Sequence, residues 1–214
     1  MPRKPKYTKE EITKYGLEIV RKQGAESLTA REMAKELGTT VAPIFVHFSS
    51  MDELRQEVRA LARNIFREYV RKGMDAKIPF LEVGLRYVRF AKEESELYRF
   101  LFLNDNVADA KASHYGMDEF IRSQEMVWEC VRDFYRMDDL QAEHFARNMW
   151  LVAHSIATLI VAGGGDFTEK EIATIYAELS ISLCKAYKEI PGLAEGTFDK
   201  DAIFGELLNR KLPF

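Results

Sequence analysis

Residues 28–54 have the sequence LTAREMAKELGTTVAPIFVHFSSMDEL, and this stretch decides the fold of the N-terminal part of the chain. Thr29 can cap one short helix, and Gly38 can end it, because glycine readily adopts a positive φ. The turn at residues 38–40 is then followed by a second short helix near residues 41–47. Two short helices joined by such a turn form a helix-turn-helix, whose second helix enters the major groove of DNA. The stretch therefore predicts a DNA-binding regulator.

The residues before this stretch predict another helix. Thr8 and Glu11 form a capping box, and the glycine at position 24 suits a left-handed residue just after the helix end. Thr29 and Glu32 repeat the capping-box spacing at the start of the next helix. The sequence therefore predicts a compact unit of three short helices at the N-terminus.

The remainder of the chain carries helical periodicity and shows no alternating apolar runs with hairpin turns. A long helix is expected from Asp52 to about residue 72, and it joins the two parts directly, because no Ser- or Pro-rich linker separates them. Further helices are expected near residues 80–92, 95–103, 117–136, 139–162, 168–189 and 199–209. The prediction is an all-α fold, with a helix-turn-helix domain at 1–50 and a helical bundle domain at 51–214.

Charge is divided unevenly along the chain, whose formal net charge is −3. Residues 1–59 carry eleven Lys and Arg against nine Asp and Glu, whereas residues 60–214 carry twenty against twenty-five. Arg3, Lys4 and Lys6 precede every acidic residue and form a basic arm. This asymmetry favours contact with nucleic acid at the N-terminal end and a different task for the acidic remainder.

Composition places the chain among globular proteins, with 47% hydrophobic and 30% charged residues. No apolar run approaches the roughly 18 residues that a membrane-spanning helix needs, and the charged N-terminus lacks the apolar segment of a secretory signal. We therefore expect a cytoplasmic protein without membrane contact. Cys130 and Cys184 have no metal-ligand or redox spacing. Both are interpreted as buried hydrophobes, and no metal or cofactor is expected.

The stretch from Ile12 to Leu54 resembles the TetR family of bacterial transcriptional regulators. The positions that carry the resemblance are Ile12, Gly24, Leu28, Thr29, Met33, Ala34, Leu37, Gly38, Ile44, Phe45, His47, Phe48 and Leu54. Trp150 and His154 are similar to a Trp…His-Gly helix of some TetR-family effector domains, although Ser155 replaces the glycine. The resemblance implies a homodimer whose N-terminal units bind the two half-sites of a palindromic operator. It also implies C-terminal helices that bind a small ligand, and repression as the usual mode of regulation.

The resemblance assigns DNA contacts to particular side chains. The predicted DNA-binding residues are Arg3, Lys4, Lys6, Thr29, Arg31, Thr39, Thr40, Val41, Ala42, Phe45 and His47. Thr29 offers a hydroxyl and helix N-terminal amides to a phosphate, and Arg31 can reach a base edge. Thr40 is expected to cap the recognition helix, and His47 to contact a phosphate. Three alternatives stay open: Arg31 as a solvated charge, His47 as a structural residue, and the basic arm as a solubilising tail.

The expected recognition helix, residues 41–47, contains no Arg, Lys, Asn or Gln. Hydrogen-bonded recognition of bases by this helix is therefore poor, which leaves apolar contact with thymine methyl groups as its main direct option. Periodicity alone predicts one buried stripe, made of Val41, Ile44, Phe45 and Phe48. The family register, which we favour, instead turns Val41 and Phe45 toward DNA. Ile44 and Phe48 then remain in the core.

The acidic C-terminal part is rich in large apolar side chains, most of which belong to the core. If a ligand pocket lies among these helices, its expected lining is Phe66, Tyr69, Tyr87, Phe90, Phe120, Trp128, Trp150 and His154. Such a lining favours an apolar or aromatic ligand. The two helices near 139–162 and 168–189 are expected to form the homodimer interface, through Ala153, Ala157, Ile160, Ile172, Tyr176, Leu179 and Leu183. The alternative is that these helices are buried within one chain.

Two other classes of protein stay open at this stage. A small helical enzyme has little support, because the four His residues lack metal-ligand spacing and no nucleophile elbow, P-loop or dinucleotide motif occurs. A helical interaction protein whose helix-turn-helix does not bind DNA is favoured only by the missing polar residues of the recognition helix. The prediction is therefore a non-enzymatic, DNA-binding transcriptional regulator, and more specifically a ligand-responsive repressor.

Overall fold

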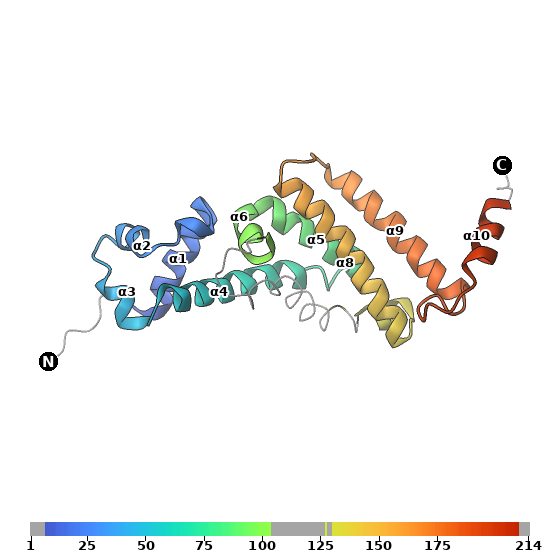
Figure 1. Ribbon diagram of the computed structural model, residues 1–214, viewed down its shortest axis with the longest axis horizontal. Helices are drawn as coiled ribbons and strands as arrows, with labels where there is room; N and C mark the ends of the chain where they lie inside the picture. The colour runs from blue at the N-terminus through green and yellow to red at the C-terminus, as the bar shows by residue number, and fades with distance from the viewer. Residues whose placement is uncertain (1–6, 104–126, 128–129, 210–214) are drawn as a thin grey trace.

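A computed structural model describes residues 7–103, 127 and 130–209 of the chain. Every regular element in these residues is a helix, and the molecule is elongated, with the N-terminal helices at one end and α10 at the other (Figure 1). The elements are α1 (Lys9–Gln23), η1 (Ala25–Ser27), α2 (Ala30–Glu36), α3 (Ala42–His47), α4 (Met51–Arg71), α5 (Pro79–Glu93), α6 (Ser95–Tyr98), η2 (Arg99–Leu103), α8 (Asp139–Val161), α9 (Glu169–Glu189) and α10 (Lys200–Asn209). None of these helices is long and apolar enough to cross a membrane.

The all-α prediction is confirmed, and most of the expected helices begin and end within two residues of their observed bounds. Most of the helix expected near 117–136 lies outside the described residues, although residues 130–135 are helical. The helix expected at 95–103 is instead two short elements, because α6 ends at Tyr98 and the chain continues as the π-helical turn η2. Such wide turns occur often at functional sites.

Side-chain caps fix where the first two helices begin. At α1 the capping box is complete: the Glu11 N–H donates to Thr8 Oγ1 at 3.2 Å, and the Thr8 N–H donates to the Glu11 carboxylate at 2.8 Å. At α2 only half of the predicted box forms. The Glu32 N–H donates to Thr29 Oγ1 at 3.2 Å, but the Glu32 carboxylate pairs with Lys35 Nζ at 2.6 Å.

The first three helices and the beginning of α4 share one small core. Leu28, Ile44 and Leu54 are fully buried in it. Gly16 of α1 lies so close to α4 that a Cβ atom would be 2.7 Å from Val58 Cγ2. The first half of α4 therefore completes the N-terminal unit, and its second half joins the bundle. A domain boundary at residue 50 stays a prediction.

The C-terminal bundle consists of α5, α8 and α9 packed against the second half of α4 (Figure 1). α8 and α9 run antiparallel, side by side. α9 contacts α5 at Gly84, where a Cβ atom would lie 2.2 Å from Cζ of Tyr176. A side chain at position 84 would push the two helices apart, so this contact requires glycine.

Candidate DNA-binding and effector sites

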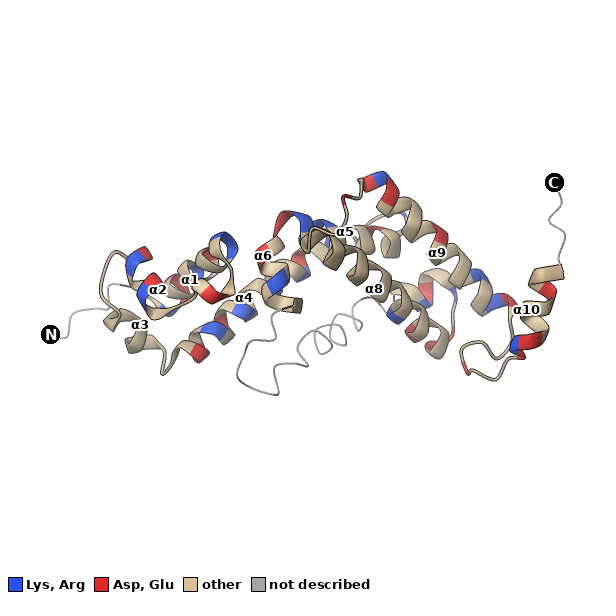
Figure 2. Cartoon of the chain, turned by 45° about the horizontal axis from the view of Figure 1, so that its top comes forward, with Lys and Arg blue, Asp and Glu red and all other residues tan. Residues whose placement is uncertain are grey.

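The burial pattern of α3 follows the register inferred from the family resemblance. Ile44 and Phe48 are buried, whereas Val41 is 41% exposed and Phe45 is 48% exposed. The interpretation based on periodicity alone, which buries all four residues in one stripe, is therefore wrong. Figure 2 shows α3 as a helix without acidic or basic side chains at the end of the molecule.

The start of α3 differs from the prediction. Thr40 was expected to cap the helix, but the N-cap residue is Val41, and no side chain accepts a hydrogen bond there. Pro43 lies in the first turn, where its missing N–H costs nothing, so the helix can begin without a side-chain cap. Thr40 is exposed and Thr39 is half-buried. Contact of these two residues with DNA stays a prediction.

Tyr7, which precedes α1, forms hydrogen bonds with the helix-turn-helix. The sequence did not indicate this role. Its hydroxyl donates to the Leu37 carbonyl at 2.5 Å, and its own carbonyl lies 2.8 Å from His47 Nε2. The available signal was an apolar residue directly before the N-cap, which commonly packs onto the following helix. The Tyr7 ring does pack on that helix, edge-on against Tyr15 of α1, with ring centroids 6.3 Å apart. This bond supports the structural interpretation of His47, whose phosphate contact stays a prediction.

Arg31 is the basic side chain of α2 best placed for DNA. It is exposed, and within residues 7–103 and 130–209 it makes no hydrogen bond or ion pair. Lys35, one turn later, pairs with Glu32. Thr29 is also exposed, and its hydroxyl hydrogen remains available for a phosphate because the oxygen acts only as an acceptor in the cap. Arg3, Lys4 and Lys6 lie outside the described residues.

We expect Arg31→Ala to weaken operator binding by about 1–3 kcal/mol and to relax specificity at one base pair, as the loss of a base contact does. Affinities for a set of single-base operator variants measure both effects. Arg71→Ala, at the far end of α4, removes an exposed arginine and serves as the control with unchanged affinity. A small loss that is equal for all sequences would make Arg31 a phosphate-contacting or surface residue instead.

A small cavity of about 40 Å³ opens between α4, α5, α8 and α9. Three of the predicted pocket residues line it: Phe66, Tyr87 and Trp150. The other described lining residues are Val70, Phe80, Val83, Gly84, Val127, Ala146, Ala153 and Tyr176. Ala153 and Tyr176 had been assigned to the dimer interface instead. The others were missed because apolar residues at helical spacing form the same pattern whether they fill a core or border a cavity.

The remaining predicted pocket residues lie elsewhere. Phe90 is fully buried and packs against Phe66. Tyr69 packs against Phe90 and donates to the Glu93 carboxylate at 2.8 Å. Neither residue lines the cavity. Phe120 and Trp128 lie outside the described residues. His154 does not line the cavity either, but its ring stacks on Trp150, with centroids 4.8 Å apart.

His154 is the centre of a polar network beside the cavity. The Tyr87 and Tyr98 hydroxyls lie 3.0 Å and 2.9 Å from its Nδ1 atom. Nδ1 of a neutral imidazole makes one hydrogen bond, and the tautomer decides whether it accepts that bond from a phenol or donates it to one. Tyr98 has a second partner in Thr158 Oγ1 at 3.1 Å. Burial lowers the pKa of His154 and raises the pKa values of both tyrosines, so all three side chains are neutral near pH 7.

This network predicts a pH-dependent stability. Because the pKa of folded His154 lies below the ordinary value of 6.5, the unfolded chain binds more protons at this site as the pH falls through that value. The free energy of unfolding therefore falls between about pH 7.5 and 5.5, and His154→Gln removes that part of the decline. Urea unfolding of both proteins at each pH measures it. Parallel pH curves for the two proteins would contradict the prediction.

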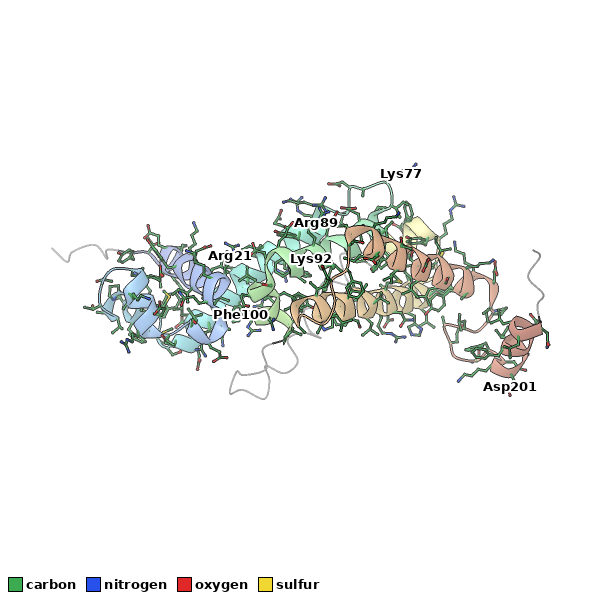
Figure 3. All side chains as sticks on the ribbon, turned by 90° about the horizontal axis from the view of Figure 1, so that it is seen from above. Arg21, Lys77, Arg89, Lys92, Phe100 and Asp201 are labelled. Carbon is green, nitrogen blue, oxygen red and sulfur yellow. The ribbon has the colours of Figure 1, made fainter. Side chains whose placement is uncertain are left out.

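The segment containing Tyr98 also contacts the DNA-binding unit. Arg21, near the end of α1, donates to the Glu94 carboxylate at 2.8 Å, just before α6. Gly24 has φ +83°, the positive φ predicted for a glycine at this helix end, although its ψ of 168° lies outside the left-handed helical region. A Cβ atom there would lie 3.0 Å from the Glu96 carboxylate. Figure 3 shows Arg21 at the end of α1 that lies toward the bundle. The α6 segment is therefore a direct contact between the two parts.

Two further contacts fix α6 and η2 in the bundle. Arg99 donates to the Val161 carbonyl at the end of α8. Phe100 lies beneath the buried guanidinium of Arg59 from α4, with 4.5 Å between the Cζ atom and the ring centroid. The segment thus touches α1, α4 and α8 at once.

The predicted dimer residues of α8 and α9 are mostly buried by their own chain. Ala153, Ala157, Ile172 and Tyr176 have almost no exposed surface, so the prediction that they face a partner is wrong for this conformation. Ala153 and Tyr176 instead line the cavity, and Ile172 lies near Leu85 and Val88 of α5, as the alternative of burial within one chain requires. Ile160 and Leu183 are half-buried, and Leu179 is exposed.

An exposed helix-turn-helix joined by one long helix to a bundle with an internal cavity is the architecture of a DNA-binding regulator. Residues 12–58 match the family described as "Bacterial regulatory proteins, tetR family". Residues 80–180 match the family described as "Tetracyclin repressor-like, C-terminal domain". The chain belongs to the TetR family and is a DNA-binding transcriptional regulator. A search of curated proteins found no match.

Proposed function

We propose that this regulator is a homodimeric repressor that leaves its operator when a small neutral ligand enters the aromatic cavity. One observation carries the proposal: Tyr87 lines the cavity and shares His154 with Tyr98, which belongs to the segment in contact with α1. A ligand that displaces Tyr87 therefore acts on side chains that reach the DNA-binding unit.

The cavity lining selects the chemistry of the ligand. None of its described residues carries a charge, and the neighbouring His154 is neutral because burial lowers its pKa. An ionic ligand would lose its hydration without gaining a counter-charge there. A volume of about 40 Å³ is far below the ~300 Å³ of an ordinary ligand site, so binding requires side chains such as Trp150 to move. A neutral, largely apolar ligand with one hydrogen-bonding group fits this site.

The homodimer is supported by an apolar face on the outer side of the bundle. Leu151, Ser155 and Leu159 follow one another at four-residue spacing on α8, and all three are exposed. On the neighbouring helix α9, Leu179 is also exposed, one turn after the half-buried Ile175. Exposed leucines on two adjacent helices are typical of a surface that a partner covers. We place the dimer interface on this face.

The proposal can be tested with operator duplexes selected by the protein from a random-sequence library. Small neutral aromatic compounds and their carboxylate and quaternary ammonium analogues are then titrated against the complex. We expect neutral compounds to change tryptophan fluorescence and to release the duplex. Release by the charged analogues alone, or by none of the compounds, would contradict the proposal.

A second arm tests the route from the cavity to DNA. Arg21→Ala removes the ion pair with Glu94, and we expect it to keep the fluorescence response while losing most of the release. The matched control is Arg89→Ala, which breaks the ion pair with Glu169 inside the bundle, at 3.1 Å, and should leave both responses intact (Figure 3). Equal behaviour of the two variants would remove the α6 segment from the route.

A further inference from the structure

The most exposed residues of α3 and its N-cap all have apolar side chains. Val41, Ala42, Phe45 and Val46 are exposed, and Val46 is 66% exposed, which is unusual for so large a hydrophobic residue. The four positions have the spacing i, i+1, i+4 and i+5, so they lie on one side of the helix. We call these four residues the apolar recognition face.

Polar groups near this face are few. His47 Nε2 is occupied by the Tyr7 carbonyl, and the Thr40 hydroxyl lies before the helix begins. None of the four residues of the apolar recognition face can donate or accept a hydrogen bond from its side chain. The face therefore cannot distinguish the donor and acceptor patterns by which base pairs differ in the major groove.

One feature of the major groove remains available to such a face. Thymine carries a methyl group on C5, and cytosine does not. We propose that α3 recognises this C5-methyl group itself, so that it accepts thymine and 5-methylcytosine alike and discriminates against uracil and unmethylated cytosine. Thymine and 5-methylcytosine differ in the group on C4, an acceptor in one and a donor in the other, and the face has no side chain that detects this difference. The inference rests on the DNA-binding function of the protein.

The expected size of the effect follows from the burial of apolar groups. Covering one methyl group contributes roughly a fourfold gain in affinity. If each of two half-sites offers two methyl groups, removing all four lowers affinity by more than about a hundredfold. The loss of affinity caused by removing a single methyl group is therefore measurable, and removing all of them weakens operator binding strongly.

The decisive experiment changes the DNA and leaves the full-length protein intact. One duplex selected from a random library is synthesised in four forms. The first keeps its thymine·adenine pairs, and the second has uracil in place of each thymine. The third and fourth replace those pairs by 5-methylcytosine·guanine and by cytosine·guanine. We expect tight binding of the thymine and 5-methylcytosine duplexes, and at least tenfold weaker binding of the uracil and cytosine duplexes. Equal affinity for thymine and uracil, or rejection of 5-methylcytosine, would overturn the inference.

Protein variants assign the effect to α3. Phe45→Ala should bring the ratio of thymine to uracil affinities close to one. Arg31→Ala should weaken both duplexes and leave that ratio unchanged, since Arg31 lies on α2 outside the apolar recognition face. A ratio that Phe45→Ala leaves unchanged would overturn the assignment to α3.

Failure to bind any duplex at low salt would overturn the DNA-binding function as well, whereas binding without methyl preference would overturn only this inference.

Discussion

Gly84→Ala is expected to lower the free energy of unfolding by about 1–3 kcal/mol, the usual range for adding an atom to a packed contact. The added Cβ would lie 2.2 Å from Cζ and 2.6 Å from the hydroxyl oxygen of Tyr176, which is itself buried. Alanine also gains about 1 kcal/mol in helix propensity over glycine. The clash outweighs that gain, because Tyr176 is confined by Phe80, with ring centroids 6.0 Å apart. Urea unfolding measures the difference.

A double-mutant cycle and a control make this result specific. Tyr176→Ala removes the ring from the clash, so the two substitutions together should cost clearly less than the sum of their separate effects. Gly205→Ala is the control, because a Cβ there meets no atom within 4 Å, and it should leave stability unchanged or slightly higher. If the Gly84→Ala variant were as stable as the wild-type protein, α5 and α9 would be able to move apart without cost.

Leu179→Glu is expected to convert the proposed homodimer to a monomer and to weaken operator binding by more than about a hundredfold. The reason is that a carboxylate in an apolar interface loses its hydration without gaining a partner. Joining two half-site contacts in one molecule typically contributes 10²–10⁴ in affinity, and a monomer loses that gain. Sedimentation velocity gives the oligomeric state, and titration of a two-half-site duplex gives the affinity.

Ile181→Glu is the matched control for this experiment. Ile181 is 67% exposed, more than Leu179, but it lies two residues further along α9 and therefore on the other side of the helix. Glu178 and Lys185 are one turn away on that same side. We expect Ile181→Glu to stay dimeric and to bind the operator normally. A monomeric Ile181→Glu together with a dimeric Leu179→Glu would move the interface to the opposite face of α9.

Local signals in the sequence predicted much of the fold. The Thr8 capping box, the positive φ of Gly38 and the long helix after Ser50 depend on residues close together in the chain, and all are present. The family resemblance also placed Ile44 and Phe45 on the correct sides of α3, where periodicity alone did not. Contacts within one or two helical turns are therefore well encoded in short segments.

Long-range features of the bundle could not be predicted in the same way. α8 is nearly free of charge after Met149, so it has two apolar sides, and periodicity cannot tell which one packs inward. The sequence interpretation chose Ala153 and Ala157 for the dimer interface, but both are buried within the chain, and Ala153 lines the cavity. The bond between Tyr7 and Leu37 spans thirty residues, and no local pattern marks it.

The ion pair between Arg21 and Glu94 has a thermodynamic consequence that runs in both directions. A contact through which ligand binding changes the affinity for DNA must also let DNA change the affinity for the ligand, and by the same factor. The operator-bound protein would then be a poorer receptor than the free protein. Under the proposed function, the ligand concentration needed for a response in a cell would then depend on how many operator sites bind the protein, as well as on the chemistry of the cavity.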